Sequence, residues 1–207
     1  SVEKKEKSVS EEEDEPVTSS EIIKELLSWV RMIALGVIVG VLLVVFVIQR
    51  DNVYGSSMSP NLVDGEVIFT EKISTYFDSY HRGDIVILDG HDMEGYNREE
   101  YLIKRIIGLP GETIRIADEH VYIKPADSDE FYLLDEPYLD ETVVTTVMSR
   151  GIALGYNEMT LGPDEYFCMG DNRVVSNDSR NLGPFTSDRI RGVAVIAVYP
   201  FEMFGVL

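Results

Sequence analysis

A long uncharged apolar segment constrains this chain more than any other feature. Residues 32–49 read MIALGVIVGVLLVVFVIQ, and no Asp, Glu, Lys or Arg occurs between Arg31 and Arg50. About 20 such residues in a helix cross the hydrocarbon core of a bilayer. A cleaved signal peptide has a shorter apolar stretch behind a short basic leader, and a buried core helix is seldom apolar on every face. The pattern therefore favours a transmembrane span within a helix over residues 21–50, with Trp29 as an interfacial anchor.

The charges on either side of the span predict its orientation. Lys24 and Arg31 precede it, further lysines lie in the N-terminal tail, and only Arg50 follows closely. Because cytoplasmic flanks carry the excess of Lys and Arg, we expect the N-terminus in the cytoplasm and residues 51–207 on the outer side of the cell membrane. Residues 1–20 contain EEEDEP and few apolar side chains. They are therefore expected to form a disordered acidic tail.

The region after the span, residues 51–207, is predicted to be mainly β. Short apolar runs are separated by turns of Gly, Pro, Asp and Asn, a pattern typical of a twisted antiparallel sheet or a barrel-like domain. Residues 125–163 are less regular, so we expect an insertion or long loops there. The predicted strands cover 66–70, 84–89, 101–107, 112–116, 120–124, 165–170 and 192–200.

Charge, cysteine and histidine content argue against several classes of function. A formal net charge of -19 does not fit nucleic-acid binding, which needs a basic face. Any attachment to a membrane has to come from apolar burial. Cys168 is the one cysteine, so an intrachain disulfide is excluded, and its apolar surroundings predict a buried hydrophobic residue. The histidines lack ligand spacing, and we predict no metal, cofactor or nucleic-acid partner. They are His81, His91 and His120.

Two motifs after the span contain a serine and a lysine of interest. YGSSMSPNLVDGE places Ser57 before Met58 and a turn at Pro60, and taken alone this is a turn serine. YLIKRIIGLPGETI places Lys104 beside Arg105 in an apolar, strand-like run. Successive strand residues face opposite sides, so one of these two cations is expected to point toward the packed face. The lysine either snorkels at a strand edge, or burial lowers its pKa and makes it a base near neutral pH.

Two further motifs are polar or strand-like. GDNRVVSNDSR is a dense polar run between apolar strands. In it, Ser176 offers a hydroxyl to orient an amine, and Asp178 with Arg180 holds the loop. The alternative is an ordinary polar loop with a structural ion pair. HRGDIVILDG, residues 81–90, is predicted to be a supporting strand without a chemical role.

The serial order of these motifs resembles the bacterial type I signal peptidases, and the single span resembles their Gram-positive form. G-x-S-M-x-P is followed by R-G-D-I-V, then K-R-I-I-G-L-P-G-E, then G-D-N-R-x-x-S-x-D-S-R. The resemblance implies that Ser57, rather than Ser56, is the nucleophile and that Lys104 is the general base. Neutral Lys104 would take the Ser57 proton, and the alkoxide would attack the scissile carbonyl. The Ser57 backbone N–H would contribute to the oxyanion hole.

The same resemblance implies the supporting residues and the substrate. Ser176 would hydrogen-bond and position the lysine, while Asp178 and Arg180 would support the site. Gly55 stands where some relatives carry a hydroxyl donor, so the second oxyanion donor is unassigned. The implied activity is that of a membrane-bound serine endopeptidase that removes signal peptides after small residues at -1 and -3, without metal or cofactor. The implied partners are preprotein signal peptides and the lipid bilayer.

Two rival functions belong to other classes. A self-cleaving Ser/Lys repressor of the SOS type shares the serine before methionine and the lysine on a β scaffold. Such a protein is soluble, however, and has a DNA-binding domain where this chain has a span. A membrane-tethered β module that binds peptides without cleaving them would tolerate loss of the nucleophile or the base, whereas this sequence keeps both.

Overall fold

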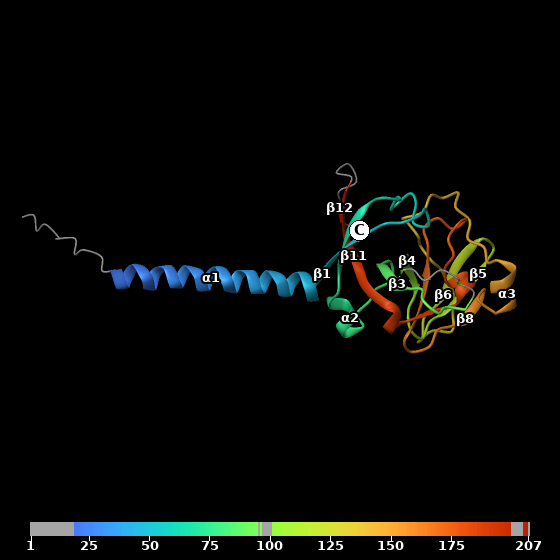
Figure 1. Cartoon of the computed structure of the whole chain (residues 1–207). Helices are drawn as coiled ribbons and strands as arrows, with labels where there is room; N and C mark the ends of the chain where they lie inside the picture. The colour runs from blue at the N-terminus through green and yellow to red at the C-terminus, as the bar shows by residue number, and fades with distance from the viewer. Residues whose placement is uncertain (1–18, 95, 97–100, 200–204, 207) are drawn as a thin grey trace, which may run out of the picture. The chain divides into compact units, whose positions relative to one another are not determined.

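The structure is a computed structural model that describes residues 19–94, 96, 101–199 and 205–206 (Figure 1). The predicted acidic tail falls mostly on residues 1–18, which lie outside the described residues. The chain divides into two compact units, residues 1–42 and residues 43–207.

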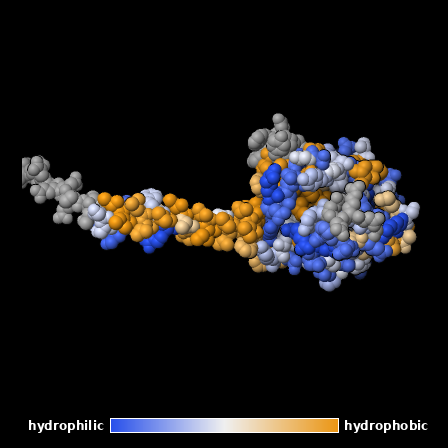
Figure 2. All heavy atoms as spheres, in the orientation of Figure 1, coloured by the Kyte–Doolittle hydropathy of each residue, from blue (hydrophilic) through white to orange (hydrophobic). Residues whose placement is uncertain are grey.

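The N-terminal helix α1 (Ser19–Phe46) is long and apolar enough to cross a membrane. Within the described residues no side chain of α1 is buried, and Figure 2 shows hydrophobic residues over most of the visible surface of its second half. The helix ends earlier than predicted, because β1 (Ile48–Asn52) follows it directly. Ile48 and Gln49, which we expected in the span, therefore lie in a strand. Pairing with residues 67–71 supplies the backbone hydrogen bonds that a continued helix would have made.

The second unit contains two sheets, and every strand pair in them is antiparallel. The larger sheet has eight strands in the order β1-β2-β11-β3-β4-β9-β10, with β12 paired to β11. The smaller sheet has the order β7-β6-β5-β8. The strands after β1 in the larger sheet are β2 (Val67–Glu71), β3 (Ile85–Asp89), β4 (Tyr101–Gly108), β9 (Glu165–Met169), β10 (Phe185–Thr186), β11 (Ile190–Tyr199) and β12 (Gly205–Val206). Those in the smaller sheet are β5 (Thr113–Ala117), β6 (His120–Lys124), β7 (Tyr132–Leu133) and β8 (Glu158–Thr160).

The prediction of a mainly β fold behind one N-terminal helix is confirmed, and each of the seven predicted strands overlaps an observed one. Residues 125–163 contain two short strands and a single helical turn between stretches of irregular chain. The short helical segments of the second unit are α2 (Ile73–Phe77), α3 (Ser149–Ala153), α4 (Ser179–Leu182) and η1 (Ser187–Arg189).

Three buried apolar clusters hold the strands together. One of them fixes the position of the predicted nucleophile, because Met58 and Leu62 pack against the strand residues Ile68, Ile85 and Ile87. Met58 is only 1% exposed. Burial of this side chain anchors the loop that carries the preceding serine to the larger sheet.

Candidate active site

An open cleft of about 1640 Å³ lies on the second unit. Its walls come from β1, from the loop after it, from the start of β4 and from the start of β11. Both Ser57 and Lys104 line it. The volume exceeds the roughly 300–1,000 Å³ of most small-molecule pockets. The cleft therefore has room for a stretch of extended polypeptide.

The loop between β1 and β2 presents Ser57 to this cleft. Burial of Met58 anchors one side of the serine, as described above. On the other side, the Gly55 N–H donates to Asp64 Oδ1 at 2.7 Å across the loop. Gly55 has a φ of 80°, a left-handed conformation that favours glycine. The fully buried Glu66 accepts a hydrogen bond from a backbone N–H of the same loop, at 3.0 Å, and so closes it.

Strand β4 brings Lys104 to the serine. Lys104 Nζ lies 2.8 Å from Ser57 Oγ and 2.7 Å from the Ile103 carbonyl oxygen, within hydrogen-bond distance of both. The lysine is only 2% exposed, so it does not snorkel to solvent at a strand edge. Lys104 is paired with Val86 of β3. This strand is part of the HRGDIVILDG motif, which was predicted to be a supporting strand. Low exposure disfavours the ammonium form of an amine, because charge loses its hydration there.

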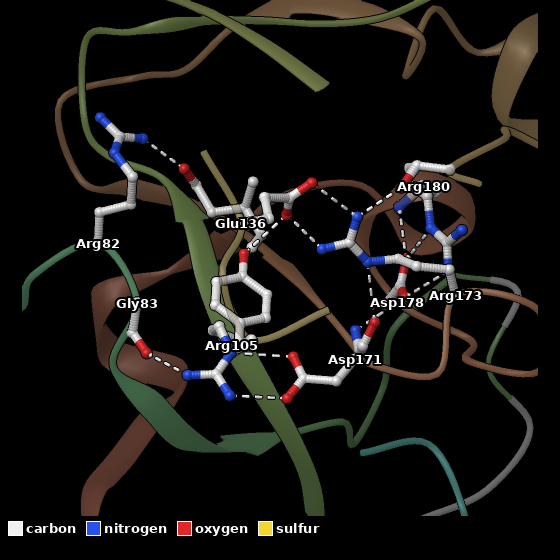
Figure 3. Close-up of polar contacts among 12 residues, drawn as sticks. Arg82, Gly83, Arg105, Glu136, Asp171, Arg173, Asp178 and Arg180 are labelled. Carbon is white, nitrogen blue, oxygen red and sulfur yellow. Dashed lines mark hydrogen bonds and ion pairs between the residues drawn. The ribbon is translucent and has the colours of Figure 1, made fainter. Parts of the chain in front are cut away.

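The next residue on β4, Arg105, is buried as well. Both cations of this strand face packed protein, because both faces of β4 are covered at this point. The guanidinium donates to both carboxylate oxygens of Asp171, at 2.9 and 2.7 Å, and to the Gly83 carbonyl at 2.8 Å (Figure 3). The Tyr138 ring covers the guanidinium at 4.1 Å.

The polar loop of residues 170–180 is held by a buried ion pair. Arg180 donates to Asp178 through Nε and through a terminal nitrogen, at 2.9 and 2.8 Å. The Gly170 N–H donates to the same carboxylate at 3.0 Å. Burial alone would raise the pKa of Asp178, but the hydrogen bonds and charge of Arg180 outweigh it and hold that pKa below its usual value. Asp178 and Arg180 thus fold the loop back onto the end of β9.

Two residues of this loop contact the serine segment directly, and the sequence reasoning had assigned them no role. The Asn172 N–H donates to the Ser57 carbonyl at 2.9 Å, and its side-chain amide donates to the Ser56 carbonyl at 3.1 Å. Gly170 leaves the room for this contact, because a Cβ there would lie 2.4 Å from the Ser57 carbonyl oxygen. The signal was present in the sequence, since Gly170 and Asn172 are the first and third residues of the GDNR motif.

Ser176 lies beside these groups without the hydrogen bond that we expected. Its hydroxyl is buried near the Asp178 carboxylate and helps to lower the pKa of that group. No group among the described residues reaches hydrogen-bond geometry with it, however. The expected hydrogen bond to Lys104 is therefore not formed, because the amine is directed at Ser57 and at the Ile103 carbonyl. A Cβ at position 170 would also strike the Ser176 hydroxyl, at 2.3 Å.

Three further expectations concern the Ser57 backbone N–H, Cys168 and a metal site. Within the part of the chain that the structure describes, the Ser57 N–H donates to no protein acceptor. Cys168 is buried, and burial raises the pKa of its thiol. Across the described residues, no group of three His, Cys, Asp or Glu side chains is placed to hold a metal ion.

Comparisons with known proteins match nearly the whole chain. Residues 26–199 match the family described as signal peptidase, peptidase S26. The chain is 35% identical to signal peptidase I P of Bacillus subtilis subsp. natto, over 90% of this chain and 97% of that relative. It is 36% identical to signal peptidase I S of Bacillus subtilis strain 168, over 86% of this chain and 92% of that relative. Signal peptidase I of Bacillus licheniformis is 35% identical, over 86% of this chain and 90% of that relative.

Proposed function

This chain belongs to the signal peptidase family, peptidase S26, and from that premise we propose that it removes signal peptides from preproteins with Ser57 as nucleophile and Lys104 as general base. Membership of the family makes it a serine endopeptidase of the signal peptidase I type. One observation carries the assignment of the two residues. A lysine that is 2% exposed places its amine 2.8 Å from a serine hydroxyl on the wall of an open cleft.

The mechanism proposed for this pair is acyl transfer. The neutral amine of Lys104 accepts the Ser57 proton while the oxygen attacks the scissile carbonyl. The resulting ammonium donates that proton to the leaving amine, and a water activated by the same lysine releases the acyl-enzyme. Low exposure of the amine supports this sequence, because desolvation favours the neutral form that a base requires.

The surrounding residues are assigned supporting roles. The Ser57 N–H is proposed as an oxyanion donor, since it makes no other hydrogen bond within the described chain. Asp178 and Arg180 are proposed to fix the loop whose Asn172 holds the serine backbone. Ser176 is proposed to support the site from its buried position beside Gly170 and the Asp178 carboxylate, rather than through a hydrogen bond to Lys104.

Substrate selection is proposed to follow the walls of the cleft. Apolar side chains of Ile87, Leu102 and Ile103 line it on the side of the lysine. Such walls favour uncharged side chains, and we propose that the small residues at the -1 and -3 positions of a signal peptide bind there. The size of the cleft supports an extended segment of substrate, with recognition spread over several residues.

The helix α1 is proposed to anchor the enzyme in the cell membrane. It is apolar, and none of its described residues is buried against protein. The excess of Lys and Arg on its N-terminal side supports an N-terminus in the cytoplasm and a second unit on the outer side. Anchoring enzyme and substrate in one bilayer raises their effective concentration.

A cleavage assay tests the proposed function. The full-length chain in detergent is incubated with a preprotein, and the cleavage site is identified by mass spectrometry of the products. Wild type should cleave once, after a small residue, while Ser57→Ala and Lys104→Met should lose activity by roughly 10⁴-fold or more. Ser56→Ala is the matched control: it removes the neighbouring hydroxyl and keeps the backbone carbonyl through which Ser56 accepts hydrogen bonds from Asn172 and Ser59.

The outcomes of this assay distinguish the proposed protease from a module that only binds peptides. Cleavage by wild type that persists in both variants would show that another group performs the reaction. A wild-type protein that binds the signal peptide without cleaving it would instead be a peptide-binding module.

A further inference from the structure

A segment of the irregular region lies against the smaller sheet, and we call residues 134–147 the strap. Its Leu134 N–H donates to the Val121 carbonyl at 2.9 Å, and its Thr145 N–H donates to the Glu119 carbonyl at 2.8 Å. Leu134, Tyr138 and Val147 pack against the buried apolar cluster that contains Ile114 and Ile123 of the smaller sheet. Both ends of the strap are therefore tied to the smaller sheet.

Between its ends, the strap contacts two buried arginines of the catalytic region. Glu136 accepts from both terminal nitrogens of Arg173, one of them at 3.1 Å, as Figure 3 shows. Arg173 also donates to the Thr145 hydroxyl and, at 3.2 Å, to the Gly170 carbonyl. The strap is thus joined to the loop that holds the backbone of Ser57.

Tyr138 completes a closed set of contacts around Asp171. The side-chain amide of Asn61 donates to Asp171 at 2.8 Å and to the Tyr138 carbonyl at 2.8 Å. Asp171 in turn pairs with Arg105, whose guanidinium the Tyr138 ring covers. Asn61 lies on the loop of Ser57, and Arg105 directly follows Lys104. The set therefore joins the chain segments that carry the two reactive groups.

Two residues of this region, Arg173 and Tyr138, each keep one charge state near neutral pH. Burial would lower the pKa of Arg173, but hydrogen bonds and the charge of Glu136 outweigh it and raise that pKa. Burial and the neighbouring Glu136 carboxylate raise the pKa of Tyr138, so its hydroxyl remains neutral and donates to Glu136 at 2.7 Å. Neither group changes charge near neutral pH. Near neutral pH, Arg173 therefore stays charged and Tyr138 stays neutral, and both can keep donating to Glu136.

We infer that the strap is a positioning element for the reaction, in which Glu136 and Tyr138 hold the Ser57 loop and the Lys104 strand at their working separation. The inference rests on the proposed roles of Ser57 and Lys104. Strap residues do not line the cleft. Substrate contacts should therefore survive their loss, while the distance between the hydroxyl and the amine should change. Displacements of about 1 Å are enough to slow a reaction roughly 100-fold.

The test combines kinetics with a chemical probe of the pair. Glu136→Gln and Tyr138→Leu should lower kcat roughly 10- to 100-fold and leave KM within about twofold. Tyr138→Phe keeps the ring over Arg105 and should restore most of kcat.

In a Cys168→Ala background, the thiol of the Ser57→Cys variant should have a lowered pKa, because the Lys104 ammonium stabilises a thiolate. Strap variants should raise that pKa by about one unit, which slows alkylation by iodoacetamide near neutral pH about tenfold.

Glu158→Gln is the matched control, because it breaks a carboxylate–arginine pair on the smaller sheet with Arg115, away from the strap contacts. It should change neither kcat nor the thiol pKa. Strap variants that lower only the melting temperature, with kcat and thiol pKa unchanged, would overturn the inference and leave the protease function standing.

The probe also separates this inference from the proposed function. If wild type fails to cleave preproteins but the thiol pKa is lowered and responds to the strap variants, the function is wrong and the positioning role stands. An ordinary thiol pKa of about 8.5 in the Ser57→Cys variant would mean that the lysine does not act on position 57. The positioning role is then wrong as well.

Discussion

Lys104 and Arg105 are neighbours on β4, both are buried, and they face different surroundings. The amine of Lys104 meets a serine hydroxyl at the wall of the cleft. The guanidinium of Arg105 meets a carboxylate through two parallel hydrogen bonds and lies against a tyrosine ring. In the proposed mechanism, one face of the strand presents an amine that must be neutral to act as a base, and the other presents a guanidinium that stays charged.

The contrast explains why the two residue types are not interchangeable. A buried lysine loses its charge readily, whereas a guanidinium stays protonated in proteins. The planar fork of arginine also matches a carboxylate in two places, which a lysine cannot do. Adjacent positions on one strand can therefore serve catalysis and scaffolding, because strand alternation directs their side chains to opposite faces.

Exchanging the cation on the cleft face gives the largest expected effect. Lys104→Arg retains a buried positive group near Ser57 but supplies no neutral base, so kcat/KM should fall by roughly 10³-fold or more. Burst and steady-state assays on a preprotein measure the loss. Activity within tenfold of wild type would mean that the serine proton goes to another group.

Breaking the pair on the opposite face tests the scaffold. Asp171→Asn leaves the buried Arg105 without its carboxylate, and removal of one partner from a buried pair costs about 3–5 kcal/mol. Urea unfolding of wild type and variant measures the difference in the free energy of unfolding. Arg105→Met with Asp171→Leu, which removes both charges, should recover part of that loss. A single variant as stable as wild type would show that the pair contributes nothing to folding.

Activity and stability should also separate on a pH scale, because they depend on different titrating groups. Protonation of Lys104 removes the base, so kcat/KM should fall about tenfold per pH unit on the acid side of its pKa. Stability should persist to lower pH. Arg180 holds the pKa of Asp178 below its usual value, so this carboxylate stabilises the fold above the unfolded-state pKa of about 3.9, and that contribution is lost as the pH falls through the folded-state pKa.

Rate profiles and circular dichroism measured at the same pH values check this separation. Activity should disappear while the circular dichroism spectrum remains native, and the spectrum should change only below about pH 4. A simultaneous loss of both signals would instead attribute the acid limb to unfolding.

Apolar alternation predicted a strand around Lys104. The assignment of Ser57 and Lys104 as nucleophile and base came from the resemblance to the type I signal peptidases, and it stays a prediction, although the structure brings the two side chains within 2.8 Å of each other. Covering of both faces of β4 was not predictable, because it depends on segments far away in the sequence. Asp171 and Asn172 were quoted within a motif, yet their partners became visible only when the loop was folded against Ser57 and Arg105.

The strap escaped prediction for a related reason. Its residues lie in a region without periodicity, where no local pattern indicates a partner. Glu136 finds Arg173 through long-range packing of an irregular segment on the smaller sheet. That Ser176 makes no hydrogen bond to Lys104 in the described part of the chain was not predictable either, because matching a motif predicts which residue occupies a place and leaves the direction of its hydroxyl open.

Breaking an exposed ion pair should cost much less stability than breaking the buried pair of Arg105 and Asp171. Arg115 and Glu158 lie across β5 and β8 with side chains 38% and 48% exposed, and they make the same two-point contact as Arg105 with Asp171. Water and salt screen such a pair, so Glu158→Gln should leave the melting temperature and kcat/KM unchanged within error. Thermal unfolding at low and high salt measures the effect beside Asp171→Asn. Equal losses in the two variants would mean that pair geometry, rather than burial, sets the cost, and the contrast between exposed and buried pairs would then be wrong.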